Sequence, residues 1–357
     1  MSKILLNKWF FLIVFLFISG SGLFYLIKRG EKVIEIDAVK SPQLKSGQES
    51  PSISINENEG ESSFSGIKCD NYNKRPIAIM LANDPTARPI SGLSLADLVI
   101  EMPVITGGIT RIMAVFQCEN PNKVGSIRST RHDFIPLATG LDAVLVHWGG
   151  SHYALDILKK KVMDNIDALS DNYNIFWREP GFFSPNNGYT SFNNINNALK
   201  IFGYRETTTF EGYLHSDQTP TDKKKGTLEI GYSLPYNVRY EYNSETNSYL
   251  RWRNGVVEKD RLNNKQIEAK NIIIMRAYSR QLEVDYNDVD VEGEGRVVVY
   301  KNGEEIKGSW QKLKSNSSSK LYFFDEKGVE IEFTPGQVWI EIVEPYQKVE
   351  WKTENIQ

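Results

Sequence analysis

The feature that most constrains this chain is an uncharged, apolar run near its start, from Trp9 to Ile27. As a helix, these nineteen residues would nearly match the roughly 30 Å core of a bilayer. A cleaved signal peptide has a shorter apolar region and a small-residue cleavage site, and neither is evident. The run therefore predicts an uncleaved membrane anchor within residues 1–29. Basic residues flank it on both sides and leave its orientation open.

Composition divides the rest of the chain. Residues 30–66 are rich in Ser, Glu, Asn and Gly, and they bury too little apolar surface to offset the entropy of ordering, which predicts a disordered tether. Residues 67–216 alternate strand-like and helix-like runs, which indicates an α/β domain with a mixed sheet and flanking helices. A polar linker at 217–226 precedes a smaller, mostly-β domain at 227–345, expected to be a small sandwich or barrel, and a tail at 346–357.

Local patterns predict individual elements of both domains. Apolar or alternating runs predict strands at Pro76–Ala82, Val99–Val104, Arg111–Phe116, Asp142–Trp148, Val238–Tyr242, Tyr249–Arg253, Asn271–Met275, Val297–Tyr300 and Gln337–Val343. Asn302-Gly303 is typical of a hairpin turn. Polar side chains predict helix starts at Ser94 (a capping box with Asp97), Ser129, Ser151 and Thr190 or Ser191.

Charge and cysteine content exclude some classes of function. Forty-two basic residues against 45 acidic ones leave a formal charge of −3, so no global basic field is present to hold nucleic acid. The two cysteines, Cys69 and Cys118, form no CxxC, and no four-ligand set with histidine can be assembled, so no structural metal is predicted. Outside the cytoplasm these two cysteines would form a disulfide, and inside it they would be buried thiols.

The richest segment for ligand binding runs from Asn83 to Arg131, where arginines lie beside glycines, serines and threonines at expected turns. Arginine presents a planar fork of donors that matches carboxylate or phosphate, so the segment predicts a pocket for an anionic group. The candidate ligand-binding residues are Arg88, Ser94, Arg111, Arg128, Ser129, Arg131, His147 and Ser151. In the alternative interpretation, the arginines pair inside an ordinary fold with Asp84, Asp97, Glu101 and Asp133.

Catalysis has three candidate residues. Asp97 and Glu101 are four apart and would share a helix face as an acid/base pair for glycoside cleavage, but Val99–Met102 reads as a strand, which spoils that spacing. His147 ends a strand before a Gly-Gly turn, which suits a general base and equally a structural hydrogen-bonding residue. GxSxG, HExxH and P-loop motifs are missing. Because His147, His152 and Asp156 make only a weak metal set, neither a metal nor another cofactor is predicted.

Several motifs in one order resemble the YerB-like family of extracytoplasmic bacterial lipoproteins, which pair two domains of unknown function. The motifs are RPIAIMLAN (75–83), ARPISGLSLADLVIE (87–101), GGITRIMAVF (107–116), GSIRSTR (125–131), DAVLVHWGGS (142–151), FWRE (176–179), SPNNGYTS (184–191), AKNIIIM (269–275), GSWQK (308–312) and PGQVWI (335–340). The resemblance implies a globular part on the outer side of the membrane, and no activity. Two departures are the missing lipid-attachment cysteine and Asn186, which stands where the family carries histidine.

Three hypotheses of function follow. The first is a single-pass membrane protein whose extracytoplasmic part binds anionic cell-wall material, either peptidoglycan or a phosphate-bearing glycopolymer. The second is a cell-wall hydrolase, lyase or transferase that uses Asp97, Glu101 and His147. The third is an adaptor that positions another envelope enzyme through exposed aromatic residues such as Trp252 and Trp310, although core packing of a β domain explains these tryptophans better.

Overall fold

The computed structural model describes residues 59–218 and 224–355. The predicted anchor at 1–29, most of the predicted tether and residues 219–223 of the predicted linker lie outside the described residues. Among the helices that the structure describes, none is long and apolar enough to cross a membrane.

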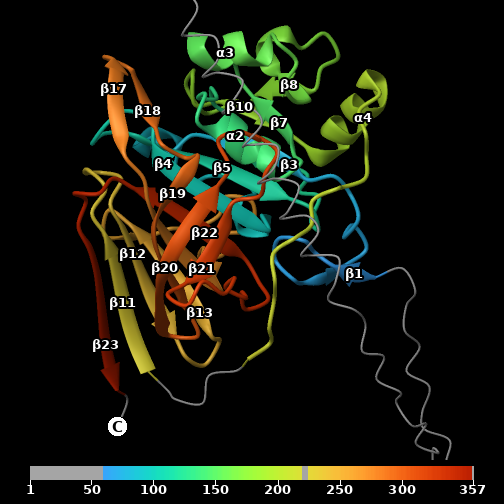
Figure 1. The fold of residues 1–357 in the computed structure, drawn as a ribbon. Helices are drawn as coiled ribbons and strands as arrows, with labels where there is room; N and C mark the ends of the chain where they lie inside the picture. Colours follow the sequence, from blue (N-terminus) through green and yellow to red (C-terminus); the bar gives the residue numbers. More distant parts are fainter. Residues whose placement is uncertain (1–58, 219–223, 356–357) are drawn as a thin grey trace, which may run out of the picture. The chain divides into compact units, whose positions relative to one another are not determined.

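Strands from both predicted domains build one mixed sheet of ten strands (Figure 1). The two regions join where β22 pairs in parallel with β4, with Val338 opposite Leu98. An α/β region with flanking helices and a smaller mostly-β region were predicted. The structure is rich in sheet with few helices in its described residues, and the sheet that the two regions share was not predicted. The strand order is β21 (Tyr322–Asp325), β20 (Glu304–Lys312), β19 (Gly293–Lys301), β16 (Asn271–Arg276), β22 (Val338–Val343), β4 (Leu98–Pro103), β5 (Thr110–Phe116), β3 (Ile77–Leu81), β7 (Val144–His147) and β8 (Asn165–Asp167).

A second, antiparallel sheet of six strands is built from residues 224–355, so it takes in the end of the predicted linker and most of the predicted tail. Its order is β14 (Val256–Val257), β13 (Ser248–Arg253), β12 (Val238–Asn243), β11 (Lys224–Ile230) and β23 (Val349–Asn355), with β15 (Glu268–Ala269) also on β13. Three smaller sheets combine β6 (Val124–Gly125), β10 (Gly188–Thr190) and β9 (Phe176–Arg178); β1 (Gly60–Glu61) and β2 (Lys68–Cys69); and β17 (Ser279–Glu283) and β18 (Tyr286–Val289).

The helices of the described residues are short and all belong to the first region. They are α2 (Phe134–Gly140), α3 (His152–Leu158) and α4 (Phe192–Phe202), with 3₁₀ turns η1 (Pro85–Ala87), η2 (Leu93–Leu95) and η3 (Ala168–Ser170). Ser151 and Ser191 cap α3 and α4 as predicted, because each side chain accepts a hydrogen bond from a backbone N–H of the first turn. The two other predicted caps are wrong, since η2 begins after Gly92 and α2 begins after Asp133.

Side-chain alternation along the ten-stranded sheet divides the core into two layers. On β3, Ile77 and Ile79 belong to one layer, whereas Ala78 and Met80 belong to the other. The first layer also contains residues of the six-stranded sheet and of α4, and the second contains residues of α2 and α3. The large sheet is therefore covered by helices on one face and mainly by the second sheet on the other.

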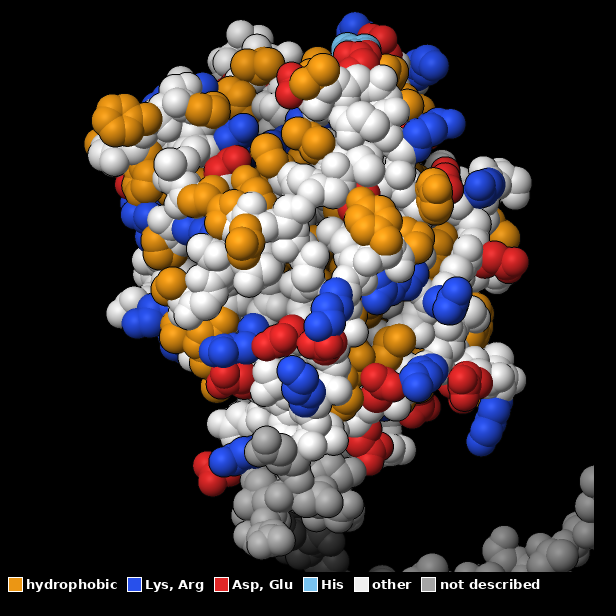
Figure 2. Space-filling view, turned by 90° about the vertical axis from the view of Figure 1, so that its left-hand side faces the viewer, with side chains coloured by type: hydrophobic (Ala, Val, Ile, Leu, Met, Phe, Trp, Pro, Cys, Tyr) orange, Lys and Arg blue, Asp and Glu red, His pale blue; other side chains and the backbone are white. Residues whose placement is uncertain are grey.

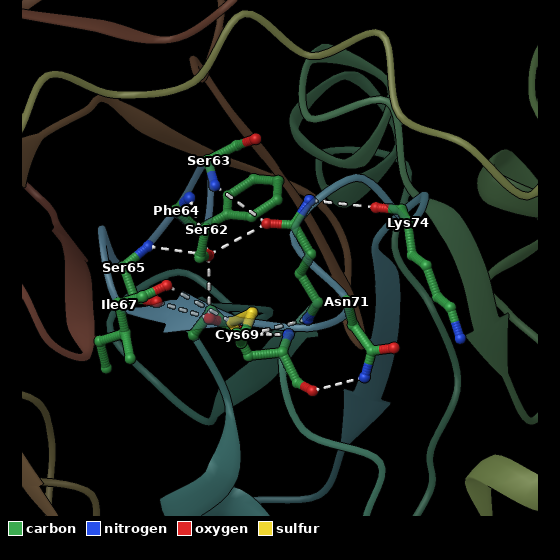
Figure 3. Close-up of a disulfide and its surroundings, with 11 residues drawn as sticks. Ser62, Ser63, Phe64, Ser65, Ile67, Cys69, Asn71 and Lys74 are labelled. Atoms are coloured by element: carbon green, nitrogen blue, oxygen red, sulfur yellow. Dashed lines mark hydrogen bonds between the residues drawn. A yellow bond between two sulfur atoms is a disulfide. The ribbon is translucent and has the colours of Figure 1, made fainter. Parts of the chain in front are cut away.

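Residues 59–66 correct the predicted end of the tether, because they fold against the first region. Phe64 is fully buried, and the hydroxyl groups of Ser62 and Ser65 donate to the carboxylate of Asp97. Figure 3 shows this loop beside the disulfide between Cys69 and Cys118. The disulfide alternative of the sequence analysis is thus the one that the structure shows.

Candidate functional site

Four arginines of the predicted ligand-binding set form what we call the outer arginine cluster. Arg88 follows η1, and Arg111 lies at the start of β5. Arg128 and Arg131 belong to the segment between β6 and α2, which runs beside β3, since the amide of Arg128 donates to the carbonyl of Met80. The cluster therefore lies where β3 and β5 meet this segment.

Electrostatic coupling links three of these guanidinium groups, those of Arg111, Arg128 and Arg131, whereas Arg88 is coupled to Arg253 of the second region. Burial, together with the positive charges of Arg131 and Arg128, lowers the pKa of Arg111 to about 9. Burial also lowers the pKa of Arg88 to about 10. The ring of Tyr236, 5.4 Å from the Arg88 guanidinium carbon, is within electrostatic reach of both Arg88 and Arg111.

The outer arginine cluster contains a single ion pair among the described residues, between Arg128 Nη1 and Asp84 Oδ2 at 3.1 Å. Arg111 is only 4 % exposed, yet its contact is a 2.8 Å hydrogen bond from Nη1 to the carbonyl of Ser129. Arg131 donates to the carbonyl of Thr130 and lies 5.1 Å from a tyrosine ring. One of the four cations thus has a direct carboxylate partner, while Asp133 and Asp285 act on Arg131, and Glu258 and Glu101 on Arg88, through their charges from a longer distance.

Two guanidinium nitrogens of the cluster have no acceptor. The Nε atoms of Arg111 and Arg131 are buried, and neither has a hydrogen-bond partner in the part of the chain that the structure describes. A buried charge is unfavourable unless an opposite charge and hydrogen bonds compensate for it. The geometry therefore suits an added anion that accepts from these forks.

A second group of charges lies between the two large sheets, and we call it the inner charge network. β4 and β22 place Glu101 and Glu341 side by side on the face toward the six-stranded sheet. β13 presents Arg251 and Arg253 to them, because alternate residues of this strand face inward. Glu258, which follows β14, closes the network.

Every charge of the inner charge network is paired. Arg251 Nη2 lies 2.7 Å from Glu101 Oε2 and 3.0 Å from Glu341 Oε1, and its Nη1 contacts Glu258. Arg253 Nη2 lies 2.6 Å from Glu101 Oε2, and its Nε is 3.1 Å from Glu258. Tyr240 and Tyr232 add hydroxyl donors to Glu341, and Asn83 and Thr110 donate to Glu101.

The pairing sets the ionisation of the two neighbouring carboxyl groups. Burial alone would raise the pKa of Glu101, but the charges of Arg253 and Arg251 outweigh it and bring the pKa down to about 2. Burial, followed by the negative charge of Glu101, raises the pKa of Glu341. Glu101 is therefore the carboxylate that stays ionised opposite the two arginines.

The predicted catalytic residues are engaged in structural contacts. Asp97 and Glu101 share no partner, because Asp97 accepts from the amides of Gln117 and Cys118 in addition to the two serines. The predicted strand over Glu101 is confirmed. The ring of His147 is buried between the carbonyl of Gly149 and the side chain of Asn165. This arrangement brings together no acid/base pair from these three residues.

The serines predicted as ligand-binding residues make other contacts. Ser94 donates to Asp260, and Ser129 donates to the carbonyl of Trp148. The hydroxyl of Ser151 is used by the cap of α3. None of these three hydroxyl groups is hydrogen-bonded to an arginine of the outer cluster among the contacts of the described residues. The carbonyl of Ser129 is the one atom of this set that touches the cluster.

The predicted metal residues are not brought together, and the two predicted adaptor tryptophans differ in exposure. His152 contacts Glu283 and Asp156 contacts Lys159, so the weak metal set with His147 does not assemble. Of the adaptor candidates, Trp310 is a core residue at 2 % exposure, with its ring N–H donating to the carbonyl of Arg276. Trp252 is partly exposed and lies under the guanidinium of Arg239.

Sequence reasoning missed three residues that contact the outer arginine cluster. Asn186 accepts from Arg128 through Oδ1 and donates to Thr86 through Nδ2. Tyr236 and Tyr286 stack on Arg88 and Arg131 from the second region. The departure at Asn186 from the family pattern was a usable signal for the first of these, whereas neither tyrosine lies in a motif.

Comparisons with known proteins agree with this fold. Residues 64–205 match the N-terminal domain, and residues 228–340 the C-terminal domain, of the protein of unknown function DUF3048. The chain is 33 % identical over 275 residues to the putative lipoprotein YerB of Bacillus subtilis strain 168, covering 76 % of this chain and 81 % of that protein. The crystal structure of YerB from Bacillus subtilis superposes with a TM-score of 0.73 at 29 % identity, covering 81 % of this chain and 99 % of that one.

Proposed function

The chain belongs to the family that pairs the N-terminal and C-terminal DUF3048 domains, and from its site we propose that it binds an anionic component of the cell envelope through the outer arginine cluster. The relative YerB carries the name of a putative lipoprotein, which supports a membrane-associated, extracytoplasmic location. The disulfide between Cys69 and Cys118 supports the same location, since such bonds persist in oxidising compartments. The ligand would be a carboxylate or phosphate of peptidoglycan or of a glycopolymer.

The observation that carries this proposal is the state of Arg111. Its guanidinium is almost fully buried, it contacts no carboxylate of the described residues, and its Nε has no acceptor. Arg128 and Arg131 add two more positive charges within electrostatic reach. A bound anion would satisfy the orphan donors and balance this charge, and each charge-assisted hydrogen bond would contribute about 1.5–3 kcal/mol.

General attraction between oppositely charged surfaces does not explain such binding. The face drawn in Figure 2 mixes Lys and Arg with Asp and Glu, in keeping with the net charge of −3. Any preference for an anionic polymer must therefore come from a local arrangement, as in the outer arginine cluster.

Retention on purified cell-wall sacculi tests the proposal. The variant Arg128→Ala/Arg131→Ala is expected to lose retention, because two of the forked contacts are removed. A matched control, Lys348→Ala/Lys352→Ala, removes the same charge from two exposed side chains that contact Glu350, and it should be retained like the wild type. Equal retention of both variants would contradict the proposal.

A further inference from the structure

A second cluster of ligand-type side chains lies next to the outer arginine cluster. His132 and Asp133 precede α2, and Asp288 lies on β18, in the hairpin that Figure 1 shows at the upper left of the view. Nε2 of His132 is 3.2 Å from Oδ1 of Asp133 and 3.4 Å from Oδ1 of Asp288. One ligand atom from each residue fits within a 4.8 Å group.

These separations suit a single bound cation. A tetrahedral ion with bonds of about 2.1 Å holds its ligand atoms about 3.4 Å apart. Arg280 pairs with the other oxygen of Asp288, Oδ2, at 2.6 Å. That contact orients the carboxylate and leaves Oδ1 facing His132, as the outer partners of metal ligands commonly do.

A second observation points to a ligand at this place. The side chain of Asp133 is only 4 % exposed, and its Oδ2 has no hydrogen-bond partner within residues 59–218 and 224–355. Nδ1 of His132 is also buried without a partner in the same described ranges. Buried polar atoms of a native fold normally have a partner in the protein, in water or in an ion. These two atoms without a protein partner therefore indicate that a further group binds here.

The cavity beside the cluster has an acidic lining, while Arg131 and Arg280 lie near the ligand side chains. A cavity of about 350 Å³ borders the cluster and is lined by Asp133, Asp288, Asp290 and Glu292, with Lys314 as a basic residue on its wall. Oε1 of Glu292 is itself buried and unpartnered in the described part of the chain. Such a lining attracts cations and leaves room for water to complete the coordination.

We propose that His132, Asp133 and Asp288 bind a divalent cation. One imidazole nitrogen with two carboxylates suits Zn²⁺ or Mn²⁺ better than Ca²⁺ or Mg²⁺, which favour all-oxygen sites. Three protein ligands leave at least one position for water or for an oxygen of a bound molecule. The outer arginine cluster shares no ligand residue with this site. A failure of anion binding would therefore not contradict cation binding, and the reverse also holds.

Titration of metal into the purified, chelator-treated chain tests the site. Competition of Zn²⁺ and of Mn²⁺ with a chromophoric chelator should show one site per chain for at least one of the two metals. The variants Asp133→Asn and Asp288→Asn should each weaken binding by more than about tenfold. The control His152→Gln alters an exposed histidine that contacts Glu283, and it should bind like the wild type.

Substitution of Co²⁺ supplies a readout that does not depend on affinity. Visible absorption bands of a nitrogen- and oxygen-ligated ion should appear in the wild type and vanish in His132→Gln. Because Asp288 is 32 % exposed, Asp288→Asn should remain folded even if the variant at buried Asp133 does not. The proposal is overturned if neither metal binds the wild type, or if binding persists unchanged in Asp288→Asn and His132→Gln.

Discussion

In the inner charge network each arginine contacts at least two carboxylates, whereas in the outer arginine cluster one of four arginines contacts a single carboxylate. The inner arginines are fully buried, whereas Arg111 is the buried member of the outer four and Arg88, Arg128 and Arg131 are half-buried. The two groups therefore differ in burial as well as in how their charges are compensated. The inner network is complete and joins the two large sheets. The outer cluster contains buried donors without acceptors and arginines without a direct carboxylate partner, as expected of a site that binds an anion.

The largest effect that separates the two regions is expected from Glu101→Gln. This change keeps the side-chain shape but removes the charge that Arg251 and Arg253 share, so it should lower the free energy of unfolding by about 3–5 kcal/mol. Urea unfolding of the variant and the wild type measures the difference. The exposed control Glu350→Gln should leave unfolding unchanged, and an equally small effect of Glu101→Gln would show that the inner network does not hold the sheets together.

Acid should weaken the inner network in a defined range of pH. The folded-state pKa of Glu101, about 2, lies below its ordinary value of 4.5, so the unfolded chain binds the proton more tightly. This contribution to stability is therefore present above about pH 4.5 and is lost as the pH falls toward about 2, with a total on the order of 3 kcal/mol. The difference in unfolding free energy between wild type and Glu101→Gln should shrink over this range, and a constant difference would contradict the assignment.

Added anion should stabilise the protein through the outer arginine cluster. Pyrophosphate at a hundred times its Kd should raise the free energy of unfolding of the wild type by about 2.7 kcal/mol. Arg128→Ala/Arg131→Ala should lose this gain, because it removes two of the forks. Thermal unfolding with and without pyrophosphate, at constant ionic strength, provides the measurement. An equal gain in the variant would place the anion elsewhere.

The smallest effect on the free energy of unfolding is expected from Arg111→Met, and its sign is opposite to that of Glu101→Gln. Removing a buried cation that has no acid partner should leave the free energy of unfolding unchanged or raise it by up to about 1 kcal/mol, since the lost hydrogen bond to Ser129 offsets part of the gain. The matched change in the inner network, Arg253→Met, should destabilise the fold. If both variants lose stability equally in anion-free urea unfolding, the two regions do not differ in the way described.

Sequence reasoning identified the strands but not their partners. Alternation along Tyr249–Arg253 predicted β13, yet it gave no sign that Arg251 and Arg253 face the core. Charged side chains at alternate positions usually face solvent, and only the acids on β4 and β22, which are distant in sequence, reverse that expectation. Glu101 was interpreted as a candidate catalytic residue because it stands four residues after Asp97, a spacing that brings two side chains together on a helix and not on a strand.

The sequence was enough to name the arginines of the outer cluster, because few segments of the chain place several arginines beside turns. The serine caps were less predictable: Ser94 and Ser129 have the residue type of a helix cap, but their hydroxyl groups instead bond to Asp260 and to the carbonyl of Trp148. Long-range contacts of this kind, like the stacking of Tyr286 on Arg131, depend on the fold and leave no local trace.

Crystals of the protein soaked in selenate offer the most direct test of the central claim, because the anomalous signal locates the anion without assumptions. The account predicts a selenium peak within hydrogen-bonding distance of the guanidinium groups of Arg111, Arg128 and Arg131. A map with no peak at this cluster, or with peaks only beside exposed lysines, would contradict it.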